Sequence, residues 1–463
     1  MILRVLFRIF AVLLLLFFSF LSACGQEGDT KTLRLQVELP SDWEENLDME
    51  VLGVGAVAPY VGTIRVVVGD GDNARTWEFP WGERAGKTGD IDLGDSDSVR
   101  VQAVTAGTVI MEGNLDNTVT GGEATIALRE SGGFSWAGSL LYPRQDHCAV
   151  AVGNTVLVIG GNLDTRVIEE IVPSGNGFAA SAYAASLIYP RTGQVVLHDA
   201  AGGNLFIFKG TISEVEDNLF EFLDLENDEN DSILLTNYRR QFSPVIEDRE
   251  VFLLGGYNSG SEWQEAALLI DAENLNEKLS TIVISLIIRD DPCCLEKSQK
   301  IICLGGGTEI IEVFDLVSRE IYVSADSFPE IQNFSLISLN SPELIVIGGN
   351  ENTTPKKEIL KFDVPSAVLT LMSGELVYPR FFHTSTLVGE NQILVIGGSP
   401  NLASSRSAEI LDLTTGQSRE LPWRMRVPRT GHTATLLADG RVLVIGGNMG
   451  EKTIEVWNPP AEY

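Results

Sequence analysis

The hydrophobic and polar residues of this chain follow two patterns, one before residue 130 and one after it. Between residues 33 and 130, short stretches alternate apolar and polar positions, as in LRLQVEL at 33–39 and VRVQAV at 99–104. Alternation with a period of two is typical of strands with one buried face, and Gly- and Asp-rich segments between such strands are typical of turns. The pattern predicts an antiparallel β-sandwich over residues 33–130.

After residue 130, the chain repeats a short apolar run that ends in a glycine pair or its remnant. The seven runs are VLVIGG ending at Gly161, LFIFKG at Gly210, VFLLGG at Gly256, IICLGG at Gly306, LIVIGG at Gly349, ILVIGG at Gly398 and VLVIGG at Gly447. Successive runs lie 43 to 50 residues apart. One strand-and-turn signature at a constant period predicts an array of similar β units.

Each repeat has further common features. Several begin with Tyr-Pro-Arg, with a histidine three residues after the arginine, and several end a later strand in an acid or amide, as in EILD at 409–412. On these motifs the chain resembles kelch-type β-propellers. On its alternating pattern alone, the segment over residues 33–130 resembles immunoglobulin-like modules of bacterial surface lipoproteins. The resemblance implies an all-β fold: an immunoglobulin-like sandwich followed by a seven-bladed kelch-type β-propeller over residues 133–463, with four strands per blade.

The two ends of the repeat region predict how the array closes. After the strand that ends at Asn458, only five residues remain, so the final repeat lacks a fourth strand. Residues 133–141 precede the first Tyr-Pro-Arg motif, where a fourth strand belongs. We expect residues 133–141 to complete the last blade, which leaves no long exposed edge.

The N-terminus has the pattern of a secretion signal. Arg4 and Arg8 precede an almost wholly apolar stretch over 9–21, which ends in Leu-Ser-Ala-Cys24. The pattern predicts a signal peptide over 1–23. The LSAC ending resembles a bacterial lipobox, which implies lipidation of Cys24, a tether over 24–32 and, with Gly25 following, an outer-membrane location. The alternative is an ordinary signal peptide.

The charge of the chain restricts its partners. The sequence has 33 Lys and Arg against 64 Asp and Glu, a net charge of −31. Such a chain repels nucleic acid, so we expect no nucleic-acid partner. The expected partners are a protein, peptide or glycan ligand in the cell envelope, and the membrane through the lipid anchor.

The repeat arginines, defined as those of the Tyr-Pro-Arg position, are the candidate ligand-binding residues. The aligned position holds Arg144, Arg191, Arg240, Arg289, Glu330, Arg380 and Arg429. In similar propellers such arginines face the channel mouth, and a guanidinium group suits acidic ligands. The structural alternative is that they pair with acids at strand ends, namely Asp315, Asp363 or Asp412.

Histidines and cysteines are assigned to structure. His147, His383 and His432 share one repeat position, which favours a structural role, and no Cys/His spacing of a zinc site is present, so we expect no metal and no cofactor. Cys293 or Cys294 could form a disulfide with Cys303, with Cys294–Cys303 as the candidate pair; all could instead be small buried hydrophobic residues.

No catalytic motif is recognisable, so the first hypothesis is a non-catalytic recognition module for acidic peptide or glycan groups. An alternative is a carbohydrate-active enzyme, mutarotase-like or oxidase-like, although the residues fit a galactose-oxidase-type copper site poorly. A second alternative is an envelope scaffold without a small ligand.

Overall fold

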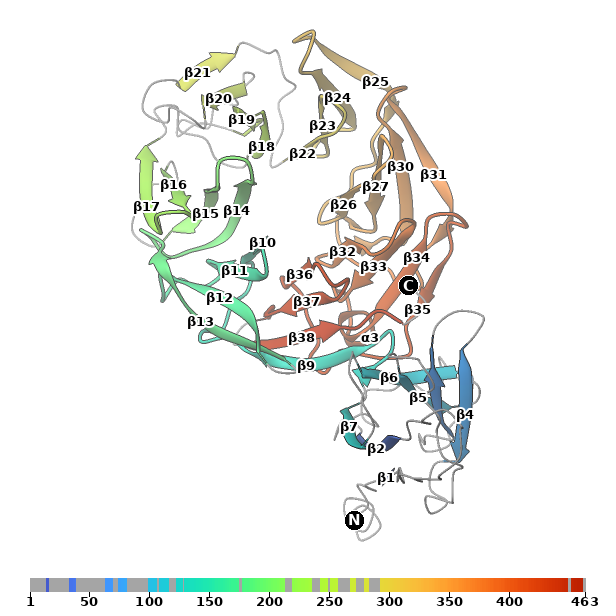
Figure 1. Ribbon diagram of the computed structural model, residues 1–463. Coiled ribbons are helices and arrows are strands. Elements are labelled where there is room, and N and C mark those ends of the chain that lie inside the picture. Colours follow the sequence, from blue (N-terminus) through green and yellow to red (C-terminus); the bar gives the residue numbers. More distant parts are fainter. Residues whose placement is uncertain are drawn as a thin grey trace, which may run out of the picture. The chain divides into compact units, whose positions relative to one another are not determined.

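The computed structural model describes residues 14–15, 33–38, 63–69, 74–80, 99–105, 108–115, 122–127, 129–174, 177–212, 219–234, 242–248, 250–256, 267–271, 279–282, 292–448 and 451–460. The chain divides into two compact units (Figure 1). The smaller unit comprises residues 1–135 with 421–424 and 457–463, and the larger comprises 136–420 with 425–456.

The described residues of the smaller unit form two sheets. The five-stranded sheet, in the order β4-β3-β5-β6-β8, consists of β3 (Thr63–Val68), β4 (Arg75–Pro80), β5 (Val99–Thr105), β6 (Thr108–Leu115) and β8 (Arg129–Glu130). Its strands are antiparallel, and β3 buries every second residue, as the alternation predicts.

The second sheet of this unit corrects one expectation. It consists of β1 (Leu14–Leu15), β2 (Leu33–Glu38) and β7 (Gly122–Ala127) in that order. The strands β2 and β7 run parallel, so this sheet is not wholly antiparallel as the sequence predicted. Parallel pairing needs a long connection, and the many residues between β2 and β7 supply one. The strand β1 falls within the expected signal peptide and pairs antiparallel with β2.

The described residues from 134 onward form seven four-stranded antiparallel sheets, which we number in chain order (Figure 1). Sheet 1 consists of β10 (Cys148–Val152), β11 (Thr155–Ile159), β12 (Val167–Ser174) and β13 (Gly177–Ser186). Sheet 2 consists of β14 (Arg191–Asp199), β15 (Asn204–Ile212), β16 (Leu219–Asp224) and β17 (Glu229–Leu234). Sheet 3 consists of β18 (Ser243–Glu247), β19 (Glu250–Leu254), β20 (Ala267–Asp271) and β21 (Leu279–Ile282).

The remaining sheets have the same plan. Sheet 4 consists of β22 (Cys293–Glu296), β23 (Lys300–Leu304), β24 (Ile310–Asp315) and β25 (Ile321–Ser327). Sheet 5 consists of β26 (Ser335–Ser338), β27 (Glu343–Ile347), β30 (Glu358–Asp363) and β31 (Val368–Glu375). Sheet 6 consists of β32 (Thr384–Leu387), β33 (Gln392–Ile396), β34 (Ala408–Asp412) and β35 (Ser418–Glu420). Sheet 7 consists of β36 (Thr433–Leu436), β37 (Val442–Ile445), β38 (Thr453–Trp457) and β9 (Phe134–Ser139).

The fourth strand of sheet 7 comes from residues 133–141, as the sequence predicts. The order of the sheet is β36-β37-β38-β9, so a strand from the start of the repeat region completes the last sheet. Asn458 continues this contact, because its N–H donates to the Gly133 carbonyl at 2.8 Å.

The apolar runs are the second strand of each sheet, and the glycine pair ends that strand. In β33, the four residues from Ile393 to Ile396 are fully buried, as expected for a strand covered on both faces. Gly397 and Gly398 follow with φ values of 63° and 92°. A Cβ at Gly397 would lie 2.8 Å from the Arg429 carbonyl oxygen, so both conformation and space require glycine.

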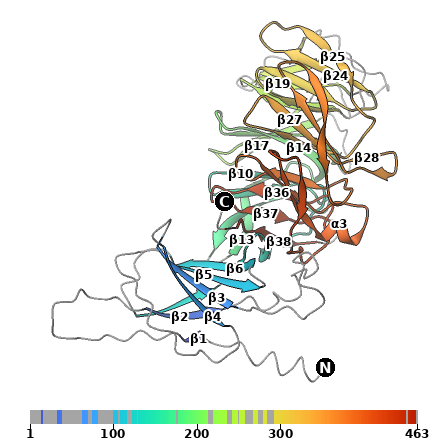
Figure 2. The same ribbon diagram turned by 90° about the vertical axis from the view of Figure 1, so that its right-hand side faces the viewer.

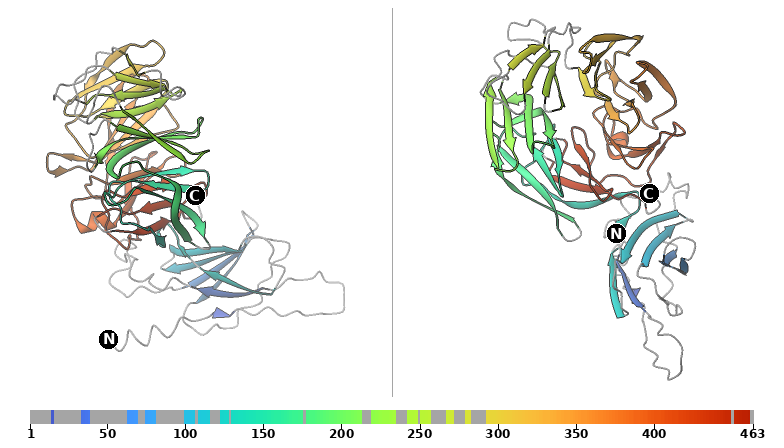
Figure 3. Two further views of the ribbon diagram at one scale, coloured as in Figure 1. Left: turned by 90° about the vertical axis from the view of Figure 1, so that its left-hand side faces the viewer. Right: turned by 45° about the horizontal axis from the view of Figure 1, so that its top comes forward.

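Each sheet packs against its neighbours in chain order (Figure 3). Buried apolar clusters join sheets 1 and 2, 2 and 3, 3 and 4, 4 and 5, and 5 and 6. Strands β32 and β36 bring sheets 6 and 7 together. A further cluster joins sheet 1 to sheet 7 through residues such as Val158 and Ile445. The stability of this unit therefore rests largely on apolar contacts between successive sheets.

In the described part of the chain, two sheets carry an additional element between their second and third strands. Sheet 5 has the hairpin of β28 (Asn350–Glu351) and β29 (Thr354–Pro355), and sheet 6 has the short helix α3 (Leu402–Arg406), capped by Asn401. Figure 2 shows β28 and α3 on the same side of the larger unit. Among the described residues, no helix is long and apolar enough to span a membrane.

Candidate functional site

The repeat arginines in the described residues are buried. The side chains of Arg144, Arg191, Arg380 and Arg429 are at most 1 % exposed. Arg240 and Arg289 lie outside the described residues. Because the four guanidinium groups have no surface to offer to a ligand, their burial supports the structural alternative for these four residues.

Each buried arginine forms an ion pair with a glutamate in the third strand of its own sheet. The pairs are Arg144 Nε–Glu169 Oε1 at 2.7 Å, Arg191 Nη2–Glu221 Oε1 at 2.6 Å, Arg380 Nη2–Glu409 Oε1 at 2.6 Å and Arg429 Nη2–Glu455 Oε1 at 2.8 Å. All eight side chains are fully buried. A buried charge is tolerable only when it is paired and hydrogen-bonded, and these pairs meet that condition.

The pair in sheet 6 shows what such an arrangement does. The Arg380 Nη1 group donates to the Gly397 carbonyl at 2.6 Å, at the end of the second strand. Glu409 also accepts from the backbone N–H groups of Val377 at 2.6 Å and Tyr378 at 3.0 Å. The pair thus ties the incoming chain, the second strand and the third strand of one sheet together.

The structural partners differ from those that the sequence predicted. The structural alternative named strand-end acids such as Asp315, Asp363 or Asp412 as partners of the arginines, but each of these accepts instead from N–H groups of the turn that follows it. For Asp412, hydrogen bonds from the Thr415 and Thr414 backbones lower the pKa of the carboxyl group. The reason is position: Asp412 ends its strand, whereas the paired Glu409 lies three residues earlier, inside the sheet.

The backbone carbonyl of each buried arginine links neighbouring sheets. Second glycines of the preceding glycine pairs donate to it: Gly161 to Arg191 at 2.8 Å, Gly349 to Arg380 at 2.8 Å, Gly398 to Arg429 at 2.9 Å and Gly447 to Arg144 at 2.9 Å. The last of these bonds joins sheet 7 to sheet 1. One residue therefore organises its own sheet through its side chain and the sheet before it through its carbonyl.

Sheet 5 has no such ion pair, and its alignment from sequence was wrong by one residue. Ile331, not Glu330, stands where the arginine stands in other sheets, because Gln332 bridges to Asn350 as Phe381 bridges to Ser399 in sheet 6. The position of the glutamate is taken by Leu360, three residues before Asp363. Ile331 and Leu360 belong to one buried apolar cluster, while Glu330 is exposed. The one-residue error arose because the segment from Phe328 to Ile331 is one residue shorter than its counterpart.

The three repeat histidines lie at the contacts between sheets. Their Nε2 atoms reach hydroxyl groups of the preceding sheet: His147 to Thr433 at 2.9 Å, His383 to Ser335 at 3.0 Å and His432 to Thr384 at 2.9 Å. Burial, with the charges of Arg144 and Arg429, lowers the pKa of His147 to about 3. Burial beside Arg380 lowers the pKa of His383 to about 3, and the pKa of His432 also falls well below its usual value. Near neutral pH, all three are therefore uncharged partners in hydrogen bonds.

Sequence reasoning missed the position between the arginine and the histidine. Among the residues that the structure describes, five sheets have a residue with positive φ there: Asp146 (52°), Gly193 (69°), Asn333 (53°), Phe382 (53°) and Gly431 (62°). Backbone bonds connect several of them, from Asp146 N–H to Gly431 at 2.9 Å, from Gly193 to Asp146 at 2.8 Å and from Phe382 to Asn333 at 3.2 Å. Gly, Asn and Asp at one repeat position were the available signal, since these residues tolerate this conformation best.

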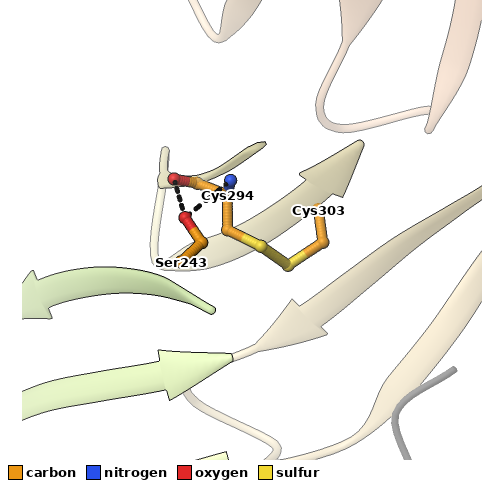
Figure 4. The surroundings of a disulfide bond; sticks show 3 residues. All are labelled: Ser243, Cys294 and Cys303. Atoms are coloured by element: carbon orange, nitrogen blue, oxygen red, sulfur yellow. Dashed lines mark hydrogen bonds between the residues drawn. A yellow bond between two sulfur atoms is a disulfide. The ribbon is translucent and has the colours of Figure 1, made fainter. Parts of the chain in front are cut away.

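The cysteines of sheet 4 form one cross-strand disulfide. Cys294 and Cys303 lie opposite each other on β22 and β23 and are disulfide-bonded (Figure 4). Ser243 of sheet 3 contacts the same place, because its hydroxyl accepts from the Cys294 N–H at 3.0 Å. The thiol of Cys148 is free, and burial raises its pKa to about 11, so it is not a reactive thiolate.

The remaining site expectations concern lipidation and metal. Cys24, the signal peptide apart from Leu14–Leu15, and the tether lie outside the described residues. Within the described part of the chain, no group of three or more His, Cys, Asp or Glu residues could hold a metal ion.

Comparison with known proteins does not assign the chain to a family. No protein-family model matches the chain, and no curated protein matches it significantly.

Proposed function

We propose that this protein is a lipid-anchored lipoprotein of the bacterial cell envelope, in which the seven four-stranded sheets are the blades of a kelch-type β-propeller. The propeller acts as a non-catalytic recognition module for a protein, peptide or glycan in the envelope. Residues 33–130, which precede the propeller in the chain, form an immunoglobulin-like sandwich, and Cys24 carries the lipid.

The observation that carries the propeller proposal is the double use of one repeated residue. A side chain that braces its own sheet and a carbonyl that accepts from the preceding sheet recur at Arg144, Arg191, Arg380 and Arg429. The bond from Gly447 to Arg144 and the fourth-strand position of β9 join the end of the repeat array to its beginning. Closure of that kind removes exposed sheet edges, which is the advantage of a propeller.

Recognition by this propeller does not use the four described arginines, since they are buried in ion pairs. The binding surface is formed instead by residues that differ from one blade to the next, because the repeated residues serve the framework. The same observation also favours a second candidate function, an envelope scaffold that binds no small ligand.

The recognition proposal is tested by a thermal-shift screen of the full-length protein against neutral sugars, acidic sugars and peptides. We expect a ligand that raises the unfolding free energy by RT ln(1 + [L]/Kd), and so raises the Tm, and that is recovered chemically unchanged after incubation. Conversion of the ligand would contradict the non-catalytic assignment. No shift with any ligand would favour the scaffold.

The anchor is tested separately with Cys24→Ala. Loss of the lipid should move the protein from the membrane fraction to the soluble fraction, measured by immunoblotting after fractionation. Cys148→Ala is the matched control and should leave the protein in the membrane fraction. Continued membrane association of Cys24→Ala would contradict lipidation at this residue.

A further inference from the structure

Sheets 5 and 6 depart from the repeat at one end of their strands. The hairpin β28–β29 and the helix α3 each follow a glycine pair, and Figure 2 shows both on one side of the larger unit. Among the described residues, these are the only named elements inserted between the second and third strands of a sheet. In a structure built of repeats, such departures are where a specific function would be located.

Backbone bonds tie both insertions to the segments before the first strands. Asn350, at the start of the hairpin, exchanges two hydrogen bonds with Gln332, at 2.8 and 2.9 Å. Ser399, just before α3, does the same with Phe381, at 2.9 and 3.3 Å. The N–H of Phe382 then donates to the Asn333 carbonyl at 3.2 Å, which joins the two sheets. These bonds therefore hold the backbone of one surface, on which Gln332, Asn333 and Phe382 are exposed, whereas Asn350 is buried.

Phe382 is the outlier of this surface. Its φ is 53°, a conformation that costs a non-glycine residue roughly 1–3 kcal/mol. The equivalent residues in other sheets are Asp146, Gly193, Asn333 and Gly431, which tolerate this conformation better. Phe382 is nevertheless 50 % exposed, so burial of its ring does not offset the strain. A strained and exposed aromatic residue points to a function outside the folded core.

The neighbours of Phe382 define what it could bind. The ring of Phe381 lies 5.4 Å away at an angle of 54°. The Phe382 N–H donates to the carbonyl of Asn333, which is exposed and donates from Nδ2 to Asn350 Oδ1 at 2.8 Å. Gln332, which precedes Asn333 in the chain, is also exposed. The nearest repeat arginine, Arg380, is fully buried by its ion pair with Glu409. The surface thus offers an aromatic face and amide groups, without a free guanidinium.

We propose that the surface formed by Gln332, Asn333, Phe381 and Phe382 binds a neutral saccharide, while the buried Asn350 holds the Asn333 amide from within. The C–H face of a sugar ring stacks on the Phe382 ring, and the amides of Gln332 and Asn333 bond its hydroxyl groups. This inference rests on the recognition function proposed above and names its ligand class. It also changes the expected ligand from an acidic glycan to a neutral one.

The test measures binding of neutral oligosaccharides of hexose and N-acetylhexosamine to the full-length protein by calorimetry, with acidic oligosaccharides and apolar peptides in parallel. Phe382→Asn keeps a residue that tolerates positive φ but removes the ring, and we expect binding to a neutral oligosaccharide to weaken roughly tenfold. Asp146→Asn changes the equivalent position of sheet 1 and should leave binding unchanged.

The Tm of Phe382→Asn is a second measurement, because a purely structural role of Phe382 predicts a lower Tm and a binding role does not. Because Asn adopts this conformation at lower cost, Phe382→Asn should have a Tm equal to or above that of the parent. A clearly lower Tm would show that Phe382 serves the fold, and would overturn the proposal.

The outcomes distinguish this inference from the general recognition function. Binding of acidic oligosaccharides or apolar peptides alone would overturn the neutral-saccharide site and leave recognition standing. Neutral-saccharide binding that Phe382→Asn does not weaken would place recognition elsewhere on the protein. No binding to any probe would overturn the inference and agree with the scaffold function.

Discussion

Sheets 5 and 6 fulfil the same structural task with opposite chemistry. In sheet 6, Arg380 and Glu409 form a fully buried ion pair. In sheet 5, Ile331 and Leu360 take the two positions and pack in an apolar cluster. The two sheets otherwise share strand order, glycine pair and backbone bridges.

The comparison shows that the charged pair is one solution, not a requirement of the fold. A buried ion pair often adds little over a well-packed apolar pair, because desolvation offsets the attraction between the charges. What the ion pair in sheet 6 adds is hydrogen bonding, since Glu409 also accepts from Val377 and Tyr378. In sheet 5 the corresponding segment contains Pro329, which has no N–H group to satisfy.

Removing one charge of the buried ion pair in sheet 6 should destabilise the protein more than any other change considered below. Arg380→Met leaves the Glu409 carboxylate buried without its partner, and we expect the free energy of unfolding to fall by about 3–5 kcal/mol. Urea denaturation followed by fluorescence measures the change. The control Glu330→Met alters an exposed residue and should change stability by less than about 0.5 kcal/mol. Equal losses in both variants would show that the pair does not brace sheet 6.

A double substitution gives sheet 6 the two apolar residues of sheet 5 and tests whether they can replace the ion pair. Arg380→Ile with Glu409→Leu removes both charges, so the loss should be smaller than for Arg380→Met. The N–H groups of Val377 and Tyr378 lose their acceptor, so a loss of about 1–3 kcal/mol should remain. A double-mutant cycle in urea measures the coupling, and additive losses would contradict a shared site.

The smallest expected change in stability concerns pH. It involves the repeat position that His383 holds in sheet 6 and Phe334 holds in sheet 5. Because the folded-state pKa of His383 lies near 3, below the ordinary value, the unfolded chain binds a proton that the folded chain does not. Stability is therefore full above about pH 6.5 and declines as the pH falls toward 3. His147 and His432 act in the same direction.

Replacing the histidine isolates its share of this pH dependence. Between pH 6 and 5, His383→Phe should make the decline of unfolding free energy shallower by up to about 1.4 kcal/mol per pH unit. Urea denaturation at a series of pH values measures this slope, and His198→Phe, outside the repeat position, is the control. An unchanged slope in His383→Phe would mean that this residue is not buried in its neutral form.

The strands of the repeats could be predicted from the sequence, but the ion pairs between arginine and glutamate could not. Apolar runs predicted the second strands, and the incomplete final repeat predicted the fourth-strand role of β9. Three of the four glutamates that pair with the arginines stand three residues before an acid or amide, as Glu409 does before Asp412. Sequence reasoning passed over them because the strand-ending residues are equally acidic and more conspicuous.

The strands, the glycine pairs and the length of each repeat follow from local periodicity, so the amino-acid sequence was enough to predict them. The buried pairs, the substitution of Ile331 for an arginine and the strain at Phe382 were decided only by the tertiary structure. The physical reason is that burial and hydrogen-bond register depend on residues far apart in the chain. A one-residue difference in a connecting segment hides that register from any linear alignment, whereas the backbone bonds between Gln332 and Asn350 fix it.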